Sequence, residues 1–121
     1  MVEPALTPAL ALDYLDELST DIRGALLLDA LGAVAASWHG DDDRAERMRP
    51  LVLELIEGAD RAAGGKPGSA SEIEVATGRG SVFAVRDRRF TLAVVAGRFV
   101  LSSLMLYDLR QVLADLGEKP A

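Results

Sequence analysis

Histidine and serine are the residue types here that could serve as a general base and a nucleophile. His39 is the single histidine of the chain, so no pair of histidines can bind a metal ion. It follows an apolar segment and is interpreted as an ordinary polar residue after a strand. Ser102 and Ser103 have no base near them in the sequence and do not lie in the Gly-x-Ser-x-Gly pattern of a nucleophile elbow. We therefore predict no catalytic residue and place both serines on a helix.

Glycine-rich and acidic segments are the remaining candidates for binding phosphate or metal ions. Gly78-x-Gly80 lies between two predicted strands and no Gly-Lys-Ser/Thr follows it, so it predicts a hairpin turn. The three aspartates at 41–43 lack the glycine and the later glutamate of a calcium loop. They favour the start of a helix, where carboxylates interact with the positive end of the helix dipole. Glu72 and Glu74 share a strand face and indicate an edge strand. We expect no cofactor and no metal ion.

Length and charge limit the other classes of function. A chain of 121 residues holds one hydrophobic core, so we expect a single domain over 1–121 with its core from about 7 to 117. The net charge is −6 and no basic stripe is present, which argues against binding nucleic acid. Charges interrupt every apolar run before the ~20 residues that cross a bilayer, so we expect no membrane insertion. With no cysteine and no basic segment of a secretory signal, the prediction is a cytoplasmic protein.

Three segments have the spacing of amphipathic helices. Thr7 and Pro8 predict an N-cap and a first helical residue, and the apolar repeat continues to about Ser19. The second helix begins at the acidic run 41–43, and the third extends from about 100 to 116. Pro50 and Gly58 interrupt the second helix. The proline either kinks it or starts a fresh segment after a short turn, and the glycine allows another backbone to approach closely.

Five segments have the composition of strands, at 25–28, 33–38, 72–75, 81–86 and 91–96. The first two are joined by Asp29-Ala30-Leu31-Gly32, a favoured β-turn pattern, and short turns imply antiparallel pairing. Segments 25–28 and 91–96 are apolar on both faces, so helices must cover both sides of the sheet and the last strand should be central. The sequence therefore predicts an α+β fold, a three-layer αβα sandwich in the order α-β-β-α-β-β-β-α.

Two segments of this chain resemble a known family. Residues 22–32, Ile-Arg-Gly-Ala-Leu-Leu-Leu-Asp-Ala-Leu-Gly, and residues 104–113, Leu-Met-Leu-Tyr-Asp-Leu-Arg-Gln-Val-Leu, are similar to the first hairpin and the closing helix of the roadblock/dynein light chain family. The resemblance is to its bacterial branch that partners small GTPases, and it covers about 11–116. It implies a profilin-like five-stranded antiparallel sheet, with the second helix on one face and the terminal helices on the other.

The resemblance also implies how the chain associates. Family members form dimers by pairing their second helices and joining their third strands edge to edge. Pro50 departs from the usual pattern of the helix that pairs. The implied interface of a homodimer comprises, on the second helix, Met48, Leu51, Val52, Leu55, Gly58, Ala59 and Ala62 and, on the third strand, Ile73 and Val75.

The function implied by the resemblance is a non-catalytic regulator or scaffold that binds a Ras-like small GTPase in bacterial signalling. Arg44, Arg47 and Arg49 are candidates for contact with the GTPase, and a solvated helix face is the plainer interpretation of the same residues. Two alternatives stay open from the sequence: a small-molecule sensor of the PAS or GAF type, and a pure assembly subunit without a GTPase partner.

Overall fold

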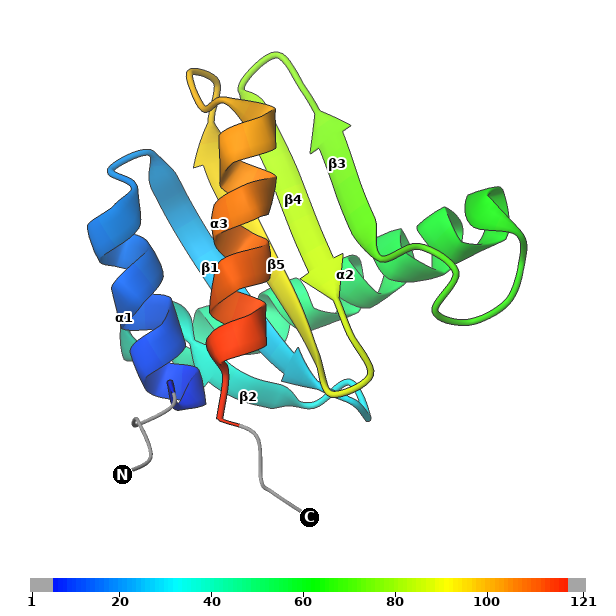
Figure 1. The fold of residues 1–121 in the computed structure, drawn as a ribbon, viewed down its shortest axis with the longest axis horizontal. Coiled ribbons are helices and arrows are strands. Elements are labelled where there is room, and N and C mark those ends of the chain that lie inside the picture. The colour runs from blue at the N-terminus through cyan, green and yellow to red at the C-terminus, as the bar shows by residue number, and fades with distance from the viewer. Residues whose placement is uncertain (1–5, 118–121) are drawn as a thin grey trace.

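The computed structural model describes residues 6–117. Its elements follow the predicted order α-β-β-α-β-β-β-α, and a short 3-10 turn precedes the second helix (Figure 1). The elements are α1 (Pro8–Leu18), β1 (Ile22–Asp29), β2 (Val34–Ser37), the 3-10 turn (Trp38–Gly40), α2 (Asp42–Ala63), β3 (Glu72–Ala76), β4 (Gly80–Arg86), β5 (Phe90–Gly97) and α3 (Ser102–Asp115).

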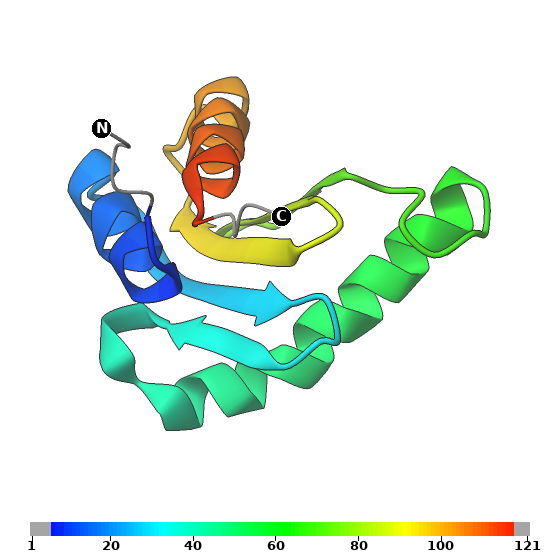
Figure 2. The ribbon, with the colours of Figure 1, turned by 60° about the horizontal axis from the view of Figure 1, so that its bottom comes forward.

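The five strands form one antiparallel sheet in the order β2-β1-β5-β4-β3. The prediction that β5 is central is confirmed, and β2 and β3 are the edges. α1 and α3 lie on one face of the sheet and α2 crosses the other (Figure 2). The chain is therefore the predicted three-layer αβα sandwich.

Each face of the sheet has its own hydrophobic core. On the side of α1 and α3, the large side chains of Phe83, Leu15 and Leu109 are buried together with the strand residues that face them. On the side of α2, Val52 and Ile56 pack against Leu26 and neighbouring small strand residues, including alanines. Successive residues of β1 and β5 point to opposite faces, which is why these two strands are apolar throughout.

The helix α2 continues through Pro50 as one element of 22 residues. Of the two interpretations of Pro50, a fresh helical segment is therefore wrong. Asp41 caps the helix, since its carboxylate accepts a hydrogen bond from the backbone N–H of Arg44 at 3.0 Å. The aspartates that follow Asp41 lie in the first turn, where the helix dipole favours them. The interpretation of the acidic run as a helix start is confirmed.

His39 and Trp38 lie just after β2. The predicted strand 33–38 ends one residue earlier than expected, because Trp38 is buried against the core in the 3-10 turn. The imidazole of His39 stacks on the indole ring at 4.4 Å between centroids and lies 2.9 Å from the Asp16 carboxylate. His39 is thus a polar residue after the second strand, as the sequence indicated.

Gly80 follows the turn between β3 and β4 and lies too close to β5 to carry a side chain. Gly80 is buried and pairs with Gly97 of β5, and an added Cβ would collide with the backbone carbonyl oxygen of Ala96. The interpretation of Gly78-x-Gly80 as a turn is confirmed.

We expect Gly80→Ala to lower the free energy of unfolding by about 1–3 kcal/mol, because the β4–β5 ladder must shift to admit the methyl group. Thermal melting followed by circular dichroism measures this change. Gly78→Ala in the same turn is the matched control, since no atom lies within 4 Å of the added Cβ. Equal melting temperatures for the two variants would contradict the close approach at Gly80.

A charged cluster holds the connection between α2 and β3. The Asp60 carboxylate accepts hydrogen bonds from the backbone N–H groups of Gly68 and Ala70, both at 2.9 Å, and from the Arg86 guanidinium at 2.8 Å. Arg86 also donates to the carbonyl oxygen of Ala70 at 2.9 Å. The amides of Ala70 and Gly68, with a contribution from Arg86, lower the pKa of Asp60 from 3.8 to about 2 against the opposing effect of burial.

The lowered pKa of Asp60 predicts how stability depends on pH. Because the carboxyl binds its proton less tightly in the folded chain, its contribution is present above about pH 4 and is lost as the pH falls towards about 2. In Asp60→Asn, the melting temperature should therefore fall less steeply between about pH 5 and pH 2 than in the unmodified protein. Burial raises the pKa of Asp87, but hydrogen bonds from Phe90 and Arg89 outweigh this effect and lower it overall. Asp87 is present in both proteins, so it does not cause a difference between their pH profiles. Identical pH profiles would contradict the role assigned to Asp60.

Candidate interaction surface

A row of valines lies uncovered on the sheet beside α2. Val75, Val82 and Val95 are directly opposite one another in the register of β3, β4 and β5. They lie on the same face as Ile73 and Ala84, which pack under α2. Val75 is 38% exposed, and Val82 and Val95 are half-buried. The row is apolar and only partly covered because α2 crosses the sheet towards β1 and β2 (Figure 2).

The helix supplies the other wall of this surface. Met48, Leu51 and Leu55 of α2 line a hollow of about 170 Å³ whose opposite wall includes Val82 and Val95. Leu51 is 67% exposed in the single chain. We call Leu51, Leu55, Val75, Val82 and Val95 the α2 groove.

The residues that the family resemblance implied for a dimer interface differ in their exposure to solvent. Met48, Leu55, Gly58 and Ala59 are half-buried on α2. Leu51, Ala62 and Val75 are exposed, while Val52 and Ile73 are buried in the core of the chain itself. The structure therefore brings Met48, Leu51, Leu55 and Val75 to one surface and places Val52 and Ile73 beneath it.

The sequence pattern does not identify Val82 and Val95 as residues of this surface. Both belong to strands that are apolar on each face, so nothing in the pattern separates a covered valine from an uncovered one. Their cross-strand pairing with the exposed Val75 distinguishes them from the covered valines of the same strands. This pairing can be recognised only when the register of β3, β4 and β5 is known.

The strand β3 leaves one edge of the sheet open beside the α2 groove. Arg86 donates its backbone N–H to the carbonyl of Ser71, and Thr77 donates to the carbonyl of Gly80. Since hydrogen-bonded pairs alternate along an antiparallel ladder, the backbone groups of residues 71, 73, 75 and 77 bond to β4. Those of residues 72, 74 and 76 point away from the sheet and can pair with another strand.

The side chains of β3 that point away from α2 are tied to α3. The Glu72 carboxylate forms an ion pair with Arg110, and Glu74 accepts a hydrogen bond from the Ser102 hydroxyl at 2.5 Å. Both glutamates are exposed. The interpretation of Glu72 and Glu74 as charged residues of an edge strand is confirmed, and Ser102 lies on a helix as expected.

The three arginines near the start of α2 have different surroundings. The guanidinium of Arg44 lies over the backbone of Gly24 in β1, where an added Cβ would be 2.6 Å from Nη2. Arg49 donates to the carbonyl oxygen of Gly32 and to the Glu46 carboxylate, both at 3.3 Å. Arg47 is exposed, and no ion pair or hydrogen bond of its side chain is found within residues 6–117. Of the three arginines, Arg47 is exposed, whereas Arg44 and Arg49 are half-buried.

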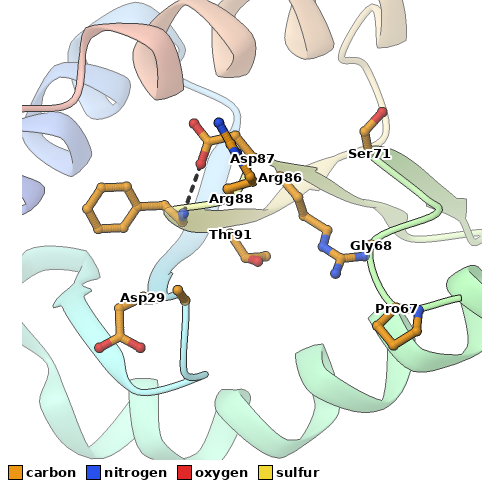
Figure 3. A pocket seen from close by; sticks show the side chains of 10 residues that line it. Asp29, Pro67, Gly68, Ser71, Arg86, Asp87, Arg88 and Thr91 are labelled. Carbon is orange, nitrogen blue, oxygen red and sulfur yellow. Dashed lines mark hydrogen bonds between the residues drawn. The ribbon is translucent and has the colours of Figure 1, made fainter. Parts of the chain in front are cut away.

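A second hollow, of about 390 Å³, lies at the end of the sheet where the β1–β2 and β4–β5 turns approach the α2–β3 connection (Figure 3). Three of the charged side chains that line it form hydrogen bonds within the chain. Asp29 accepts hydrogen bonds from the amides of the β1–β2 turn, Asp87 accepts from the amide of Phe90 at 2.9 Å, and Arg86 extends towards the connection that it holds. These side chains shape the turns.

No group of three or more histidine, cysteine, aspartate or glutamate side chains within residues 6–117 is arranged to hold a metal ion. No helix in the same range combines the length and the apolar character that crossing a membrane requires.

Solved structures with the same architecture identify the fold. No protein-family model matches the chain, and no curated protein matches it. The chain is similar to the Roadblock/LC7 domain from Streptomyces avermitilis, with 23% identity and a TM-score of 0.72 over 86% of this chain and 89% of that chain. It is similar to Myxococcus xanthus MglB, with 12% identity and a TM-score of 0.68 over 89% of each chain. An MglB with a tetrameric arrangement shows 23% identity and a TM-score of 0.66 over 93% of each chain. The chain therefore has the fold of a Roadblock/LC7 domain.

Proposed function

We propose that this chain is a single Roadblock-type domain that forms a homodimer in the cytoplasm and acts as a non-catalytic regulator or scaffold for a Ras-like small GTPase. The observation that carries the proposal is the position of the α2 groove beside the open edge of β3. A dimer that pairs its α2 helices and joins its β3 strands needs an apolar helix surface and an open strand edge on the same side of the chain. The partner class comes from the resemblance to the bacterial branch of the family.

The chemistry of the surface supports self-association. The centre of a stable interface is apolar, with a polar rim, and a standard interface buries about 800 Å² of each partner. The α2 groove supplies the apolar centre, since Leu51 and Val75 are exposed in the single chain. Backbone groups at residues 72, 74 and 76 add main-chain hydrogen bonds when a second strand is joined to β3. A copy of this chain offers the same two features, as a two-fold symmetric interface requires.

The test of the proposal is light scattering of the purified protein, alone and mixed with a Ras-like small GTPase from the same organism, loaded with GDP or with a GTP analogue. We expect the protein alone to have twice the mass of the 12.9 kDa chain. We expect a further increase in mass in one nucleotide state of the GTPase. A monomer would refute the dimer, and a dimer whose mass neither nucleotide state changes would refute the GTPase partnership.

Arg47 provides a finer prediction for the GTPase contact. We expect Arg47→Ala to weaken binding of the GTPase by about tenfold, because an exposed cation at an interface contributes through attraction to an acidic partner surface. Arg44→Ala and Arg49→Ala should weaken it less, since Arg44 is half-buried beside Gly24 and Arg49 is hydrogen-bonded within the chain. Titration by fluorescence anisotropy measures all three. If the three variants bind with equal affinity to the unmodified protein, the arginines form only a solvated helix face.

A further inference from the structure

The face of the sheet opposite the α2 groove carries its own exposed apolar surface. Of the ten large apolar side chains that are exposed among residues 6–117, seven lie on α1, on α3 or on the connection between β5 and α3. The most prominent are Phe99 at 86% exposure and Leu101 at 69%. Isolated exposed apolar residues are normal on a protein surface, but a contiguous group marks an interaction site.

This surface contains a groove at one end of the helical layer. The end of α1 and the start of α3 lie near each other there (Figure 1). Leu18, Phe99, Leu101 and Leu104 line a hollow of about 270 Å³ between them. All four side chains are exposed, so the hollow is an apolar groove open to solvent. We call it the α1–α3 groove.

Two carboxylates also line the α1–α3 groove. Asp21 lies in the connection between α1 and β1, and Asp108 lies on α3. The backbone of Asp21 is held in place, because its carbonyl accepts from the amide of Gly97 at 2.8 Å and its amide donates to Ser19 Oγ at 3.2 Å. Its Oδ2 atom is buried and has no hydrogen-bond partner within residues 6–117. The carboxylate lies against the backbone of Gly97, where an added Cβ would collide with Oδ1.

The charges around the groove are mainly acidic. Asp21 and Asp108 are the charged residues that line the hollow itself. The nearest cation by sequence, Arg98, has its guanidinium over the ring of Phe99 at 5.5 Å from the centroid. The α1–α3 groove therefore combines an apolar floor with a mainly negative rim.

We infer that the α1–α3 groove docks an amphipathic helical segment of a partner protein, one whose apolar side chains are flanked by lysine or arginine. A helix can lay its apolar side chains on Leu18, Phe99 and Leu104, in the way that grooves between helices receive amphipathic helices. A flanking cation is then attracted to the carboxylates of Asp21 and Asp108, which line the groove. This surface is separate from the α2 groove, so one chain can bind two proteins at once.

The same charges argue against two other occupants. A second copy joined through the same face would place the acidic rims of two chains against each other, and like charges across an interface are unfavourable. A lipid surface in the cell is negatively charged and attracts clusters of lysine and arginine, whereas this rim is acidic. A basic helical segment is the occupant that matches both the apolar floor and the rim.

The experiment uses a defined probe on the full chain. The probe is an ~18-residue peptide of leucine and lysine with all leucines on one helical face, long enough to form a helix, in about 150 mM salt. The matched peptide has glutamate in place of lysine. We expect the lysine peptide to shift backbone amide resonances of residues 18–21 and 98–108 in NMR spectra. We expect the glutamate peptide to bind at least about tenfold more weakly.

Variants separate the contributions of the floor and the rim. The double variant Phe99→Ser/Leu104→Ser should bind the lysine peptide at least about tenfold more weakly, and Asp21→Asn/Asp108→Asn about fivefold more weakly. Leu31→Ser is the control, since Leu31 is 94% exposed in the turn between β1 and β2. This variant should bind the lysine peptide as tightly as the unmodified protein does. Circular dichroism verifies that each variant is folded.

Several outcomes would overturn the inference. Resonance shifts confined to α2 and β3, or equal binding of the two peptides, would remove the α1–α3 groove as a basic-segment site. A fall in the mass of the unmixed protein in the Phe99→Ser/Leu104→Ser variant would assign the groove to a second copy. Cosedimentation with vesicles of phosphatidylcholine and phosphatidylserine that this variant abolishes would assign it to a membrane.

Discussion

Leu51→Asp should convert the protein from a dimer into a monomer of 12.9 kDa. In the single chain Leu51 is 67% exposed, so the new carboxylate remains hydrated and the fold is retained. In the proposed dimer the same carboxylate is buried in the α2 groove without a partner. An uncompensated buried charge costs about 3–5 kcal/mol, which raises the dissociation constant by at least about 100-fold.

Light scattering across a range of protein concentrations measures this change. Leu31→Asp is the matched control, because it adds the same charge at a leucine that is 94% exposed in the turn between β1 and β2. The control should remain a dimer, and both variants should give the circular dichroism spectrum of the unmodified protein. A folded Leu51→Asp variant that stays dimeric would place the interface away from the α2 groove.

Ala76→Pro should also weaken the dimer, without altering a side chain that packs. The backbone N–H of Ala76 points out of the sheet at the open edge of β3, and its side chain is exposed. Proline removes that donor and blocks a strand from pairing there. Leaving a carbonyl of the partner strand unpaired costs about 1–3 kcal/mol, so we expect the dissociation constant to rise by about 10- to 100-fold.

The neighbouring position provides the control for Ala76→Pro. The N–H of Val75 points towards Val82 of β4 within the same chain, so Val75→Pro should lower the melting temperature of the chain itself. Ala76→Pro should leave the melting temperature of the monomer nearly unchanged, since proline is tolerated at sheet edges where the N–H faces away. An unchanged dissociation constant in Ala76→Pro would mean that the chains associate through their helices without joining their β3 strands.

The two substitutions together distinguish the modes of association. If Leu51→Asp and Ala76→Pro both dissociate the dimer, the helix and the strand edge belong to one interface. If only Leu51→Asp does so, the helices pair and the β3 edges stay free. Because the α1–α3 groove lies on the opposite face of the sheet, neither variant should change the binding of the basic helical peptide.

The sequence by itself determined the elements and their order, because the relevant signals are local. Thr7 with Pro8 marked the start of α1, and the acidic run at 41–43 marked the start of α2. The turn at 29–32 predicted the first hairpin. Continuous apolar runs in β1 and β5 required helices on both faces of the sheet. The turns between successive strands are short, and short turns join strands that pair antiparallel.

Only the tertiary structure decided which apolar residues are free to meet a partner. The family resemblance placed Leu51 and Val52 in one interface, yet the helix crosses the sheet at an angle that buries Val52 and exposes Leu51. The same crossing leaves Val82 and Val95 partly uncovered beside Val75. Similarly, Arg44 and Arg47 are equivalent in the sequence, but Gly24 lies under Arg44 alone. The crossing angle of a helix depends on contacts between residues far apart in the chain, and for that reason periodicity predicts a buried stripe without predicting where the sheet beneath it ends.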